Sequence, residues 1–210
     1  MRVRDKAFVT LLIAAMSIQA VPVTAADAHD GKPENAPARC PIVQTEGLDS
    51  MQRTSWNEAY AQACVTLSLP AFRFAVEQSR LNTHCTLFGK REIAGKELLR
   101  LIDSSILDFT ILAAKQLQTN STNASTSIAD RTMKLTFTRL DDWRTGDRAV
   151  RASVVNTIVH EMMHLIPQPQ NSDAYYFRDS GHWLPTCNAK SLVSYGVGDL
   201  AEKAWLAMPS

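Results

Sequence analysis

Two histidines four residues apart, His160 and His164, stand with Glu161 in the sequence His-Glu-Met-Met-His. Apolar residues around them recur at helical spacing, and on a helix residues four apart lie on the same face. The two imidazoles can therefore point at one metal ion, with Glu161 beside the water that such an ion would activate. This combination is typical of zinc peptidases, in which the glutamate takes a proton from the water. The same short motif also occurs on helices that bind no metal.

A catalytic zinc site needs a third protein ligand and an open position for water. Two prolines end the helix shortly after His164, because proline cannot continue a helix. A polar turn follows, and then the stretch Asp173-Ala174-Tyr175-Tyr176, whose carboxylate could complete the site. His182 and Glu202 are alternative third ligands farther along the chain.

The motif HExxH, followed by eight residues and then Asp-x-x-Tyr, resembles the aspzincin zinc endopeptidases, which include deuterolysin and the peptidyl-Lys metalloendopeptidases. The resemblance implies a zincin-like catalytic domain that holds one Zn²⁺ per chain. It further implies a role for five residues: zinc ligands His160, His164 and Asp173, general base Glu161, and oxyanion donor Tyr176.

The chain departs from the family pattern on both sides of this stretch. Asn171-Ser172 stands where the family has Gly-Thr, and Phe177 stands where it has glycine. Substrate specificity therefore cannot be carried over. A preference for lysine, which some relatives show, would need acidic side chains in the binding pocket, and Asp179, Asp199 and Glu202 are the candidates.

The first 25 residues are typical of a secretory signal peptide rather than of a membrane anchor, the alternative. Basic residues at positions 2, 4 and 6 precede an apolar stretch at 7–18 that is short for a membrane span, and small residues follow at 23–25. We therefore expect an exported protein, either secreted or periplasmic. Residues 26–50 are expected to be extended or poorly ordered, and 51–210 to form the catalytic domain.

The net charge and the cysteines indicate which partners and which disulfides to expect. Removing the first 25 residues takes three basic residues and one acidic residue from 22 and 21, which leaves a formal net charge of −1. This balance gives no reason to expect nucleic acid or stable membrane association. We expect a peptide or protein substrate and a monomer. An even number of cysteines in an exported protein favours disulfides, and three pairings are open for Cys40, Cys64, Cys85 and Cys187.

The hydrophobic pattern predicts a mainly helical α+β domain with a small sheet. The first helix is expected to begin at Ser55, with Glu58 in its capping box, and to end before Pro70. Two more are expected over 72–82 and over 92–119, the second with a break near 103–105. The HExxH helix should begin near Asp147, and a last helix is expected over 191–208 with interruptions at two glycines. Residues 119–127 are expected to be a loop, and 141–146 a turn.

Residues 133–138 alternate between apolar and polar side chains, which predicts a strand. In zincin peptidases an edge strand before the active helix commonly pairs with the extended substrate, and this strand could do so. An ordinary strand inside a small sheet is the alternative.

The function that these observations favour is an exported zinc-dependent endopeptidase. Two alternatives remain open: an inactive exported binding protein with the same fold, and a zinc hydrolase that acts on cell-wall peptides.

Overall fold

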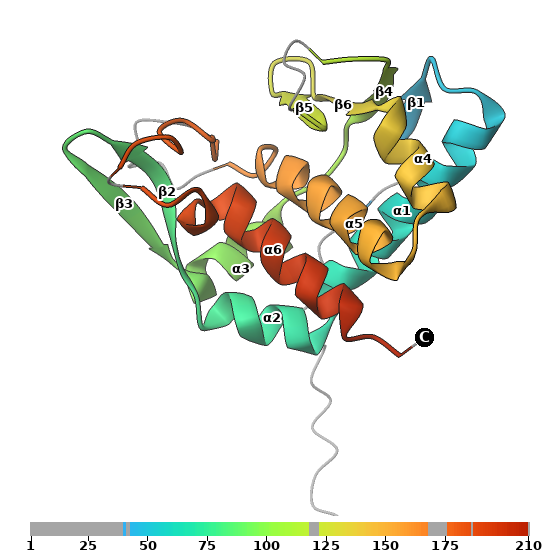
Figure 1. Cartoon of the computed structure of the whole chain (residues 1–210). Helices are drawn as coiled ribbons and strands as arrows, with labels where there is room; N and C mark the ends of the chain where they lie inside the picture. The colour runs from blue at the N-terminus through green and yellow to red at the C-terminus, as the bar shows by residue number, and fades with distance from the viewer. Residues whose placement is uncertain (1–39, 41–42, 118–121, 168–175, 186, 210) are drawn as a thin grey trace, which may run out of the picture. The chain divides into compact units, whose positions relative to one another are not determined.

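Helix α5, Arg148–Met163, carries the HExxH motif in this computed structural model (Figure 1). The carboxylate of Asp147 caps its first turn by accepting a hydrogen bond of 2.9 Å from the Val150 N–H. His164 is the C-terminal cap, so both predicted ends of the helix are confirmed. Apolar side chains on several sides of α5 are buried: Val154, Val155, Ile158, Val159, Met162 and Met163.

The structure describes residues 40, 43–117, 122–167, 176–185 and 187–209, all within one compact unit, Asn35–Ser210. The signal-peptide prediction for 1–25 and most of the segment 26–50 lie outside these residues. The remaining described helices are α1 (Ser50–Ser68), α2 (Pro70–Glu77), α3 (Gly95–Ser104), α4 (Phe137–Thr145), the 3₁₀ turn η1 (Ala189–Ser191) and α6 (Val193–Leu206). The expected α+β, mainly helical composition is confirmed. No helix among the described residues has the length and apolar character needed to cross a bilayer.

Helices α5 and α6 lie side by side in antiparallel orientation (Figure 1). Arg148, at the start of α5, bonds to carbonyls at the end of α6, whereas His160, near the end of α5, packs against Tyr195 at the start of α6. The predicted interruption of the last helix is wrong. A Cβ at Gly198 would lie 2.4 Å from Asn156 Oδ1, so this glycine allows α6 to approach α5 closely.

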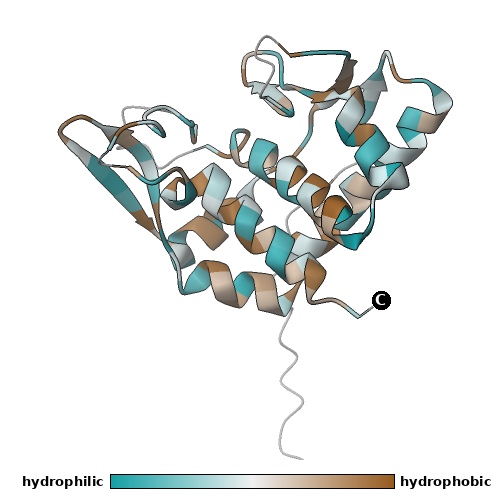
Figure 2. Ribbon diagram, viewed as in Figure 1, coloured by the Kyte–Doolittle hydropathy of each residue, from teal (hydrophilic) through white to brown (hydrophobic). Residues whose placement is uncertain are grey.

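Figure 2 shows hydrophilic and hydrophobic segments alternating along α5 and α6, as expected for helices with a buried side and a polar side. The buried side belongs to the main core, in which Trp56, Phe72, Leu98 and Ile158 are fully enclosed. Because α5 is held on several sides by this core, its histidines project from a fixed backbone.

A four-stranded sheet in the order β1-β4-β6-β5 lies beside the end of α5 (Figure 1). Its strands are β1 (Gln44–Glu46), β4 (Thr110–Ala114), β6 (Thr132–Thr136) and β5 (Ala124–Ser127), and only β5 runs antiparallel to its neighbour. The strand predicted at 133–138 is confirmed as β6. The idea that it is the edge strand is wrong, because β4 and β5 flank it and β5 forms the edge.

Several other predicted elements differ in the structure, most of them where a short apolar run fits a helix and a strand equally well. The predicted helix over 92–119 is divided among strand β3 (Gly89–Ala94), α3 and β4, although its break near 103–105 is confirmed as the end of α3. Strand β2 (Arg80–Thr86) replaces the end of the predicted helix over 72–82, and pairs with β3 as a hairpin. Part of the expected loop over 119–127 is β5. Helix α4 occupies the expected turn.

The capping box of the first helix is formed by Asp49 and Gln52 rather than by Ser55 and Glu58. Asp49 Oδ1 accepts a hydrogen bond of 2.8 Å from the Gln52 N–H, and the Gln52 side chain accepts one of 3.1 Å from the Asp49 N–H. The helix is therefore capped six residues, or nearly two turns, earlier than the position of Ser55 predicted.

Two disulfides, Cys40–Cys64 and Cys85–Cys187, resolve the pairing that the sequence left open. The second bridge ties the β2–β3 hairpin to the segment that follows the active helix. Gly181 lies against Cys85 with a φ of +84°, and a Cβ at this glycine would lie 2.3 Å from the Cys85 carbonyl oxygen. The bridge and this close contact together fix the path of residues 177–187 past the end of α5.

Candidate metal centre

The last turn of α5 brings His160, Glu161 and His164 together as a group that could hold a metal ion, with one potential ligand atom of each within 4.8 Å of the others. Glu161 is buried, and the side chains of both histidines are 13% exposed. This grouping follows from the helical repeat, because residues 160 and 164 lie one turn apart on the same face.

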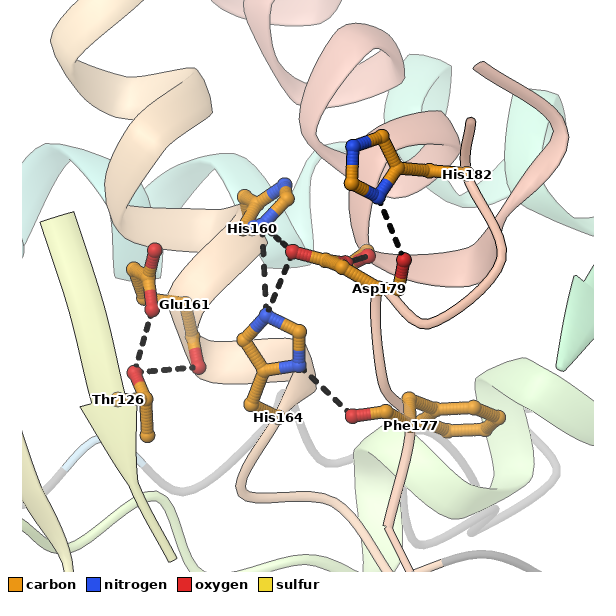
Figure 3. Close-up of polar contacts among 8 residues, drawn as sticks. Thr126, His160, Glu161, His164, Phe177, Asp179 and His182 are labelled. Carbon is orange, nitrogen blue, oxygen red and sulfur yellow. Dashed lines mark hydrogen bonds and ion pairs between the residues drawn. The ribbon is translucent and has the colours of Figure 1, made fainter. Parts of the chain in front are cut away.

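A fourth residue, Asp179, points one carboxylate oxygen at both imidazoles (Figure 3). Its Oδ2 lies 3.0 Å from His160 Nε2 and 3.4 Å from His164 Nε2, and the two Nε2 atoms are 3.3 Å apart. A tetrahedral zinc with bonds of about 2.0–2.1 Å has its ligand atoms about 3.3 Å from one another. The three donor atoms therefore already form a triangle with the dimensions of one face of such a site.

The electrostatics of this cluster are those of a charge pair. Burial by itself raises the pKa of the Asp179 carboxyl, but hydrogen bonds and charge from His160 and His164 outweigh burial and hold that pKa well below its usual range. Burial by itself lowers the pKa of His164, but the hydrogen bond and charge of Asp179, together with Glu161, raise it to about 8. Without a metal ion, Asp179 and His164 stabilise each other's charged forms.

Neighbouring groups orient two of these three donors. The His164 Nδ1–H donates a hydrogen bond of 2.7 Å to the Phe177 carbonyl, which directs Nε2 toward Asp179 (Figure 3). The hydroxyl of Ser194, which is buried at the start of α6, donates a short hydrogen bond to Asp179 Oδ1. Asp179 is therefore held through one oxygen while its other oxygen faces the histidines.

Glu161 turns away from this triangle toward the edge strand. Its Oε2 accepts a hydrogen bond of 2.6 Å from the Thr126 hydroxyl on β5 (Figure 3). This contact engages one carboxylate oxygen and fixes the orientation of the other. Glu161 therefore lies beside the potential ligands without making the direct contacts with both histidines that Asp179 makes.

The cluster opens onto a polar cleft with a volume of about 640 Å³. The Tyr195 ring stands edge-on to His160, with the ring centres 4.5 Å apart, and its hydroxyl makes no hydrogen bond with the described residues. Burial, and then the charges of Asp179 and Glu161, raise the pKa of this phenol. Thirteen described residues line the cleft: Thr122, Asn123, Ala124, Arg139, Ser153, Asn156, Thr157, His160, Glu161, Asp179, His182, Tyr195 and Asp199.

The residues that the sequence offered as third ligands lie in different places. Asp173 lies outside the described residues. His182 lines the cleft, and its Nδ1 hydrogen-bonds the Asp179 carbonyl at 2.8 Å. Glu202 accepts a hydrogen bond of 2.7 Å from Asn156. Asp179, His182 and Glu202 all lie outside the group of three residues named above, and only Asp179 contacts both histidines. Tyr176 pairs with Pro167 in an isolated β-bridge and is not among the residues that line the cleft.

Sequence reasoning proposed Asp179 only as an acid of the substrate pocket, where it does line the cleft, and did not predict its contacts with the histidines. It missed Ser194, Thr126 and Tyr195 altogether. Asp179 follows His164 by fifteen residues, a spacing that no local periodicity singles out. Thr126 precedes the motif in a segment that was expected to be a loop. The fold of residues 177–195 against the end of α5 brings three of these residues to the site, and the short strand β5 brings the fourth.

No family model, curated protein or solved structure matches this chain. The case for a function therefore depends on the geometry of the site.

Proposed function

We propose that this protein is an exported zinc-dependent peptidase, and that it cleaves peptide bonds inside a polypeptide. The observation that carries the proposal is the triangle formed by His160 Nε2, His164 Nε2 and Asp179 Oδ2, with sides of 3.0, 3.3 and 3.4 Å. Two neutral imidazoles and one carboxylate are a donor set typical of catalytic zinc, which keeps a fourth position open for water.

Asp179 is the third ligand that the described geometry favours. Asp173, the ligand implied by the resemblance to aspzincins, remains a prediction. When bound, a zinc ion would lower the pKa of a water molecule and polarise the substrate carbonyl. In the metal-bound state, His160 and His164 would be neutral, and Asp179 would supply the negative charge.

Glu161 is proposed as the general base that takes a proton from the attacking water and later passes it to the leaving amine. Its buried carboxylate is held by Thr126 through one oxygen, which leaves the other available to the water. Thr126 is in this view a positioning residue. The oxyanion that forms on the carbonyl needs a hydrogen-bond donor, and Tyr195 is a second candidate beside Tyr176.

Strand β5, which has no strand on its outer side among the described residues, is the proposed docking strand for an extended substrate. Ala124 lies on β5 and also lines the cleft, and the adjacent Thr126 bonds to Glu161. A peptide that adds to an exposed sheet edge gains backbone hydrogen bonds in register with that edge. In this proposal β5 takes the role that the sequence suggested for 133–138.

Export is supported by the two disulfides, because such bonds persist mainly in oxidising compartments. The basic and apolar pattern of residues 1–25 remains the basis for a signal peptide. Both observations agree with a secreted or periplasmic enzyme.

The test begins with the zinc content of the protein lacking residues 1–25, purified in oxidised form and dialysed against metal-free buffer. We expect close to one zinc per chain, and cleavage of members of a panel that combines unstructured proteins with cell-wall peptides. Glu161→Gln should keep the zinc and lose at least about 1,000-fold in kcat, because proton transfer is lost from the reaction. Glu97→Gln, on the exposed side of α3, is the matched control and should leave both properties unchanged.

A folded, oxidised protein that retains no zinc would contradict the proposal and favour the inactive binding protein. Full activity of Glu161→Gln would contradict the role of the base. Cleavage restricted to cell-wall peptides would keep the metal chemistry and replace the substrate class.

A further inference from the structure

One cationic side chain, Arg139 from α4, lines the cleft away from the histidines. Its side chain is only 15% exposed. Nη1 donates two rather long hydrogen bonds, of 3.2 Å to Asp142 Oδ2 and 3.3 Å to Ser153 Oγ. Nε is buried without a partner among the described residues, and Nη2 makes no hydrogen bond with them. The guanidinium group is therefore enclosed yet only partly bonded.

A buried donor that lacks a partner destabilises the fold. Arg151 Nε is likewise buried without a partner among the described residues, so the surroundings of the guanidinium group are what set Arg139 apart. Arg148 bonds carbonyls at the end of α6 and lies over Trp205, and Arg151 lies over the Trp143 ring. Arg139 has no aromatic neighbour of this kind among the described residues, and it faces the cleft instead.

The position of Arg139 relative to the metal centre can be read along α5. Its partner Ser153 precedes His160 by seven residues, which is two helical turns or about 10.5 Å. An extended peptide advances about 3.3 Å per residue, so this span corresponds to about three residues of substrate. Asn156 and Thr157 line the cleft between the two ends, and both are neutral.

The charges that line the cleft are also distributed unevenly. Glu161 and Asp179 belong to the metal centre, and Asp199 accepts a hydrogen bond of 3.2 Å from Asn156. Arg139 is the one arginine or lysine among the described residues that line the cleft. Asp142 contacts it only through Nη1, so the Nη2 end of the guanidinium can still bind an anionic group. Arginine binds carboxylates well, because its paired donors match the two oxygens of a carboxylate, the anionic group that Asp and Glu side chains supply.

We propose that Arg139 is a specificity subsite for a carboxylate of the substrate, namely an Asp or Glu side chain about three residues from the cleaved bond. This inference rests on the proposed peptidase function and adds the substrate class to it. It also differs from the lysine preference considered for the family resemblance, which would need acidic rather than basic side chains in the pocket.

The test uses pairs of fluorogenic peptides that differ by Glu against Gln, placed three residues before or three residues after the cleaved bond. For one of the two placements, the zinc-loaded protein should show a kcat/KM ratio of about 10 to 100 in favour of Glu, the size expected for one charge-assisted hydrogen bond. Arg139→Gln should bring this ratio close to one. Arg144→Gln is the matched control on the same helix, because Arg144 also pairs with an aspartate three residues away but is exposed, and it should keep the ratio.

Binding provides a second measurement that does not depend on turnover. Fluorescence anisotropy of labelled Glu and Gln peptides on the Glu161→Gln protein should show the same preference, weaker at high salt. A charge-reversal variant of Arg139 distinguishes loss of the subsite from misfolding of the protein. Arg139→Glu should prefer a Lys peptide over the Gln peptide at the same placement, a gain that misfolding cannot produce.

The outcomes separate the two proposals. Cleavage of peptides with equal kcat/KM for Glu and Gln at both placements overturns the Arg139 subsite alone. An unchanged ratio in Arg139→Gln overturns it as well. A wild-type protein that holds zinc but cleaves no peptide overturns the peptidase proposal, and with it this inference.

Discussion

The polar side chains of the first half of α5 hold the helix against its neighbours, whereas those of the second half form the candidate metal centre. In its first half, Arg148 donates to the Leu206 carbonyl at 3.2 Å and lies 5.5 Å from the centre of the Trp205 ring. Arg151 lies 5.8 Å from the centre of the Trp143 ring. These cations meet neighbours whose partial charges complement them, namely carbonyl oxygens at a helix end and the faces of aromatic rings. The first half of the helix therefore uses charge to attach α5 to α6 and α4.

In its second half, the polar groups converge on one point instead. His160 and His164 turn their Nε2 atoms toward each other at 3.3 Å, and one carboxylate oxygen of Asp179 contacts both of them (Figure 3). Two imidazole nitrogens at this separation gain little from each other, but both can bind a common cation. Charges that serve the fold are satisfied by different neighbours, whereas charges that bind a metal are aimed at the same place.

The comparison is tested most strongly by removing Asp179. We expect Asp179→Ala to weaken zinc binding by more than about 100-fold, beyond the 10- to 100-fold typical of a residue that only orients a ligand. Competition with a chromogenic chelator measures this affinity. Asp173→Ala and His182→Ala are the comparison variants. Strong loss in either one, together with intact binding by Asp179→Ala, would transfer the third ligand to that residue.

The pH dependence of the metal-free protein gives the next largest effect. The pKa of His164 is raised to about 8 in the folded state, above the ordinary value of about 6.5 in the unfolded chain. Its stabilisation is therefore complete below pH 6.5 and is lost as the pH rises through 8. We expect the free energy of unfolding in urea to fall by about 2 kcal/mol between pH 6 and pH 9.

The depressed pKa of Asp179 acts at the other end of the range, with stabilisation present above pH 4 and lost at lower pH. His164→Gln should flatten the decline above pH 6.5. In the presence of zinc, the free energy of unfolding of the wild-type protein should instead increase with pH over this range, because the metal binds the neutral imidazole and so binds better as the pH rises. A metal-free protein with constant stability from pH 6 to pH 9 would show that the histidines and Asp179 do not interact as described.

A smaller effect is expected at the first half of the helix. Arg148→Met should lower the free energy of unfolding by about 1 to 2 kcal/mol, because a cation–π contact and hydrogen bonds to the end of α6 are lost. Thermal and urea denaturation measure this change. Zinc content should remain at the wild-type value, and loss of metal in this variant would erase the distinction between the two halves.

The smallest effect concerns the start of α5. Asp147→Ala removes the side chain that accepts from the Val150 N–H at 2.9 Å, and such caps contribute about 1 kcal/mol. Asp147→Asn is the control, since asparagine can also cap a helix, and it should recover most of the stability. Zinc affinity should be the same in all three proteins.

Local patterns predicted the elements that a single stretch of chain determines. Asp147 before an apolar helical repeat, and Pro167 after it, gave both ends of α5. Alternation at 133–138 predicted β6. Patterns failed at 106–114, where Ile106, Phe109 and Leu112 fit a helical spacing but belong to the approach to β4 and to β4 itself. Short apolar runs satisfy both periods, and pairing with distant strands decides between them.

The sequence by itself determined that His160, Glu161 and His164 share one end of a helix, because the helical repeat places residues four apart on one face. Only the tertiary structure decided which residues complete the site. Asp179 and Ser194 reach it from beyond Phe177, on a segment that the Cys85–Cys187 bridge ties to a distant hairpin. Thr126 and Arg139 come from β5 and α4. These contacts depend on the packing of separate elements around α5, which no spacing along the chain encodes.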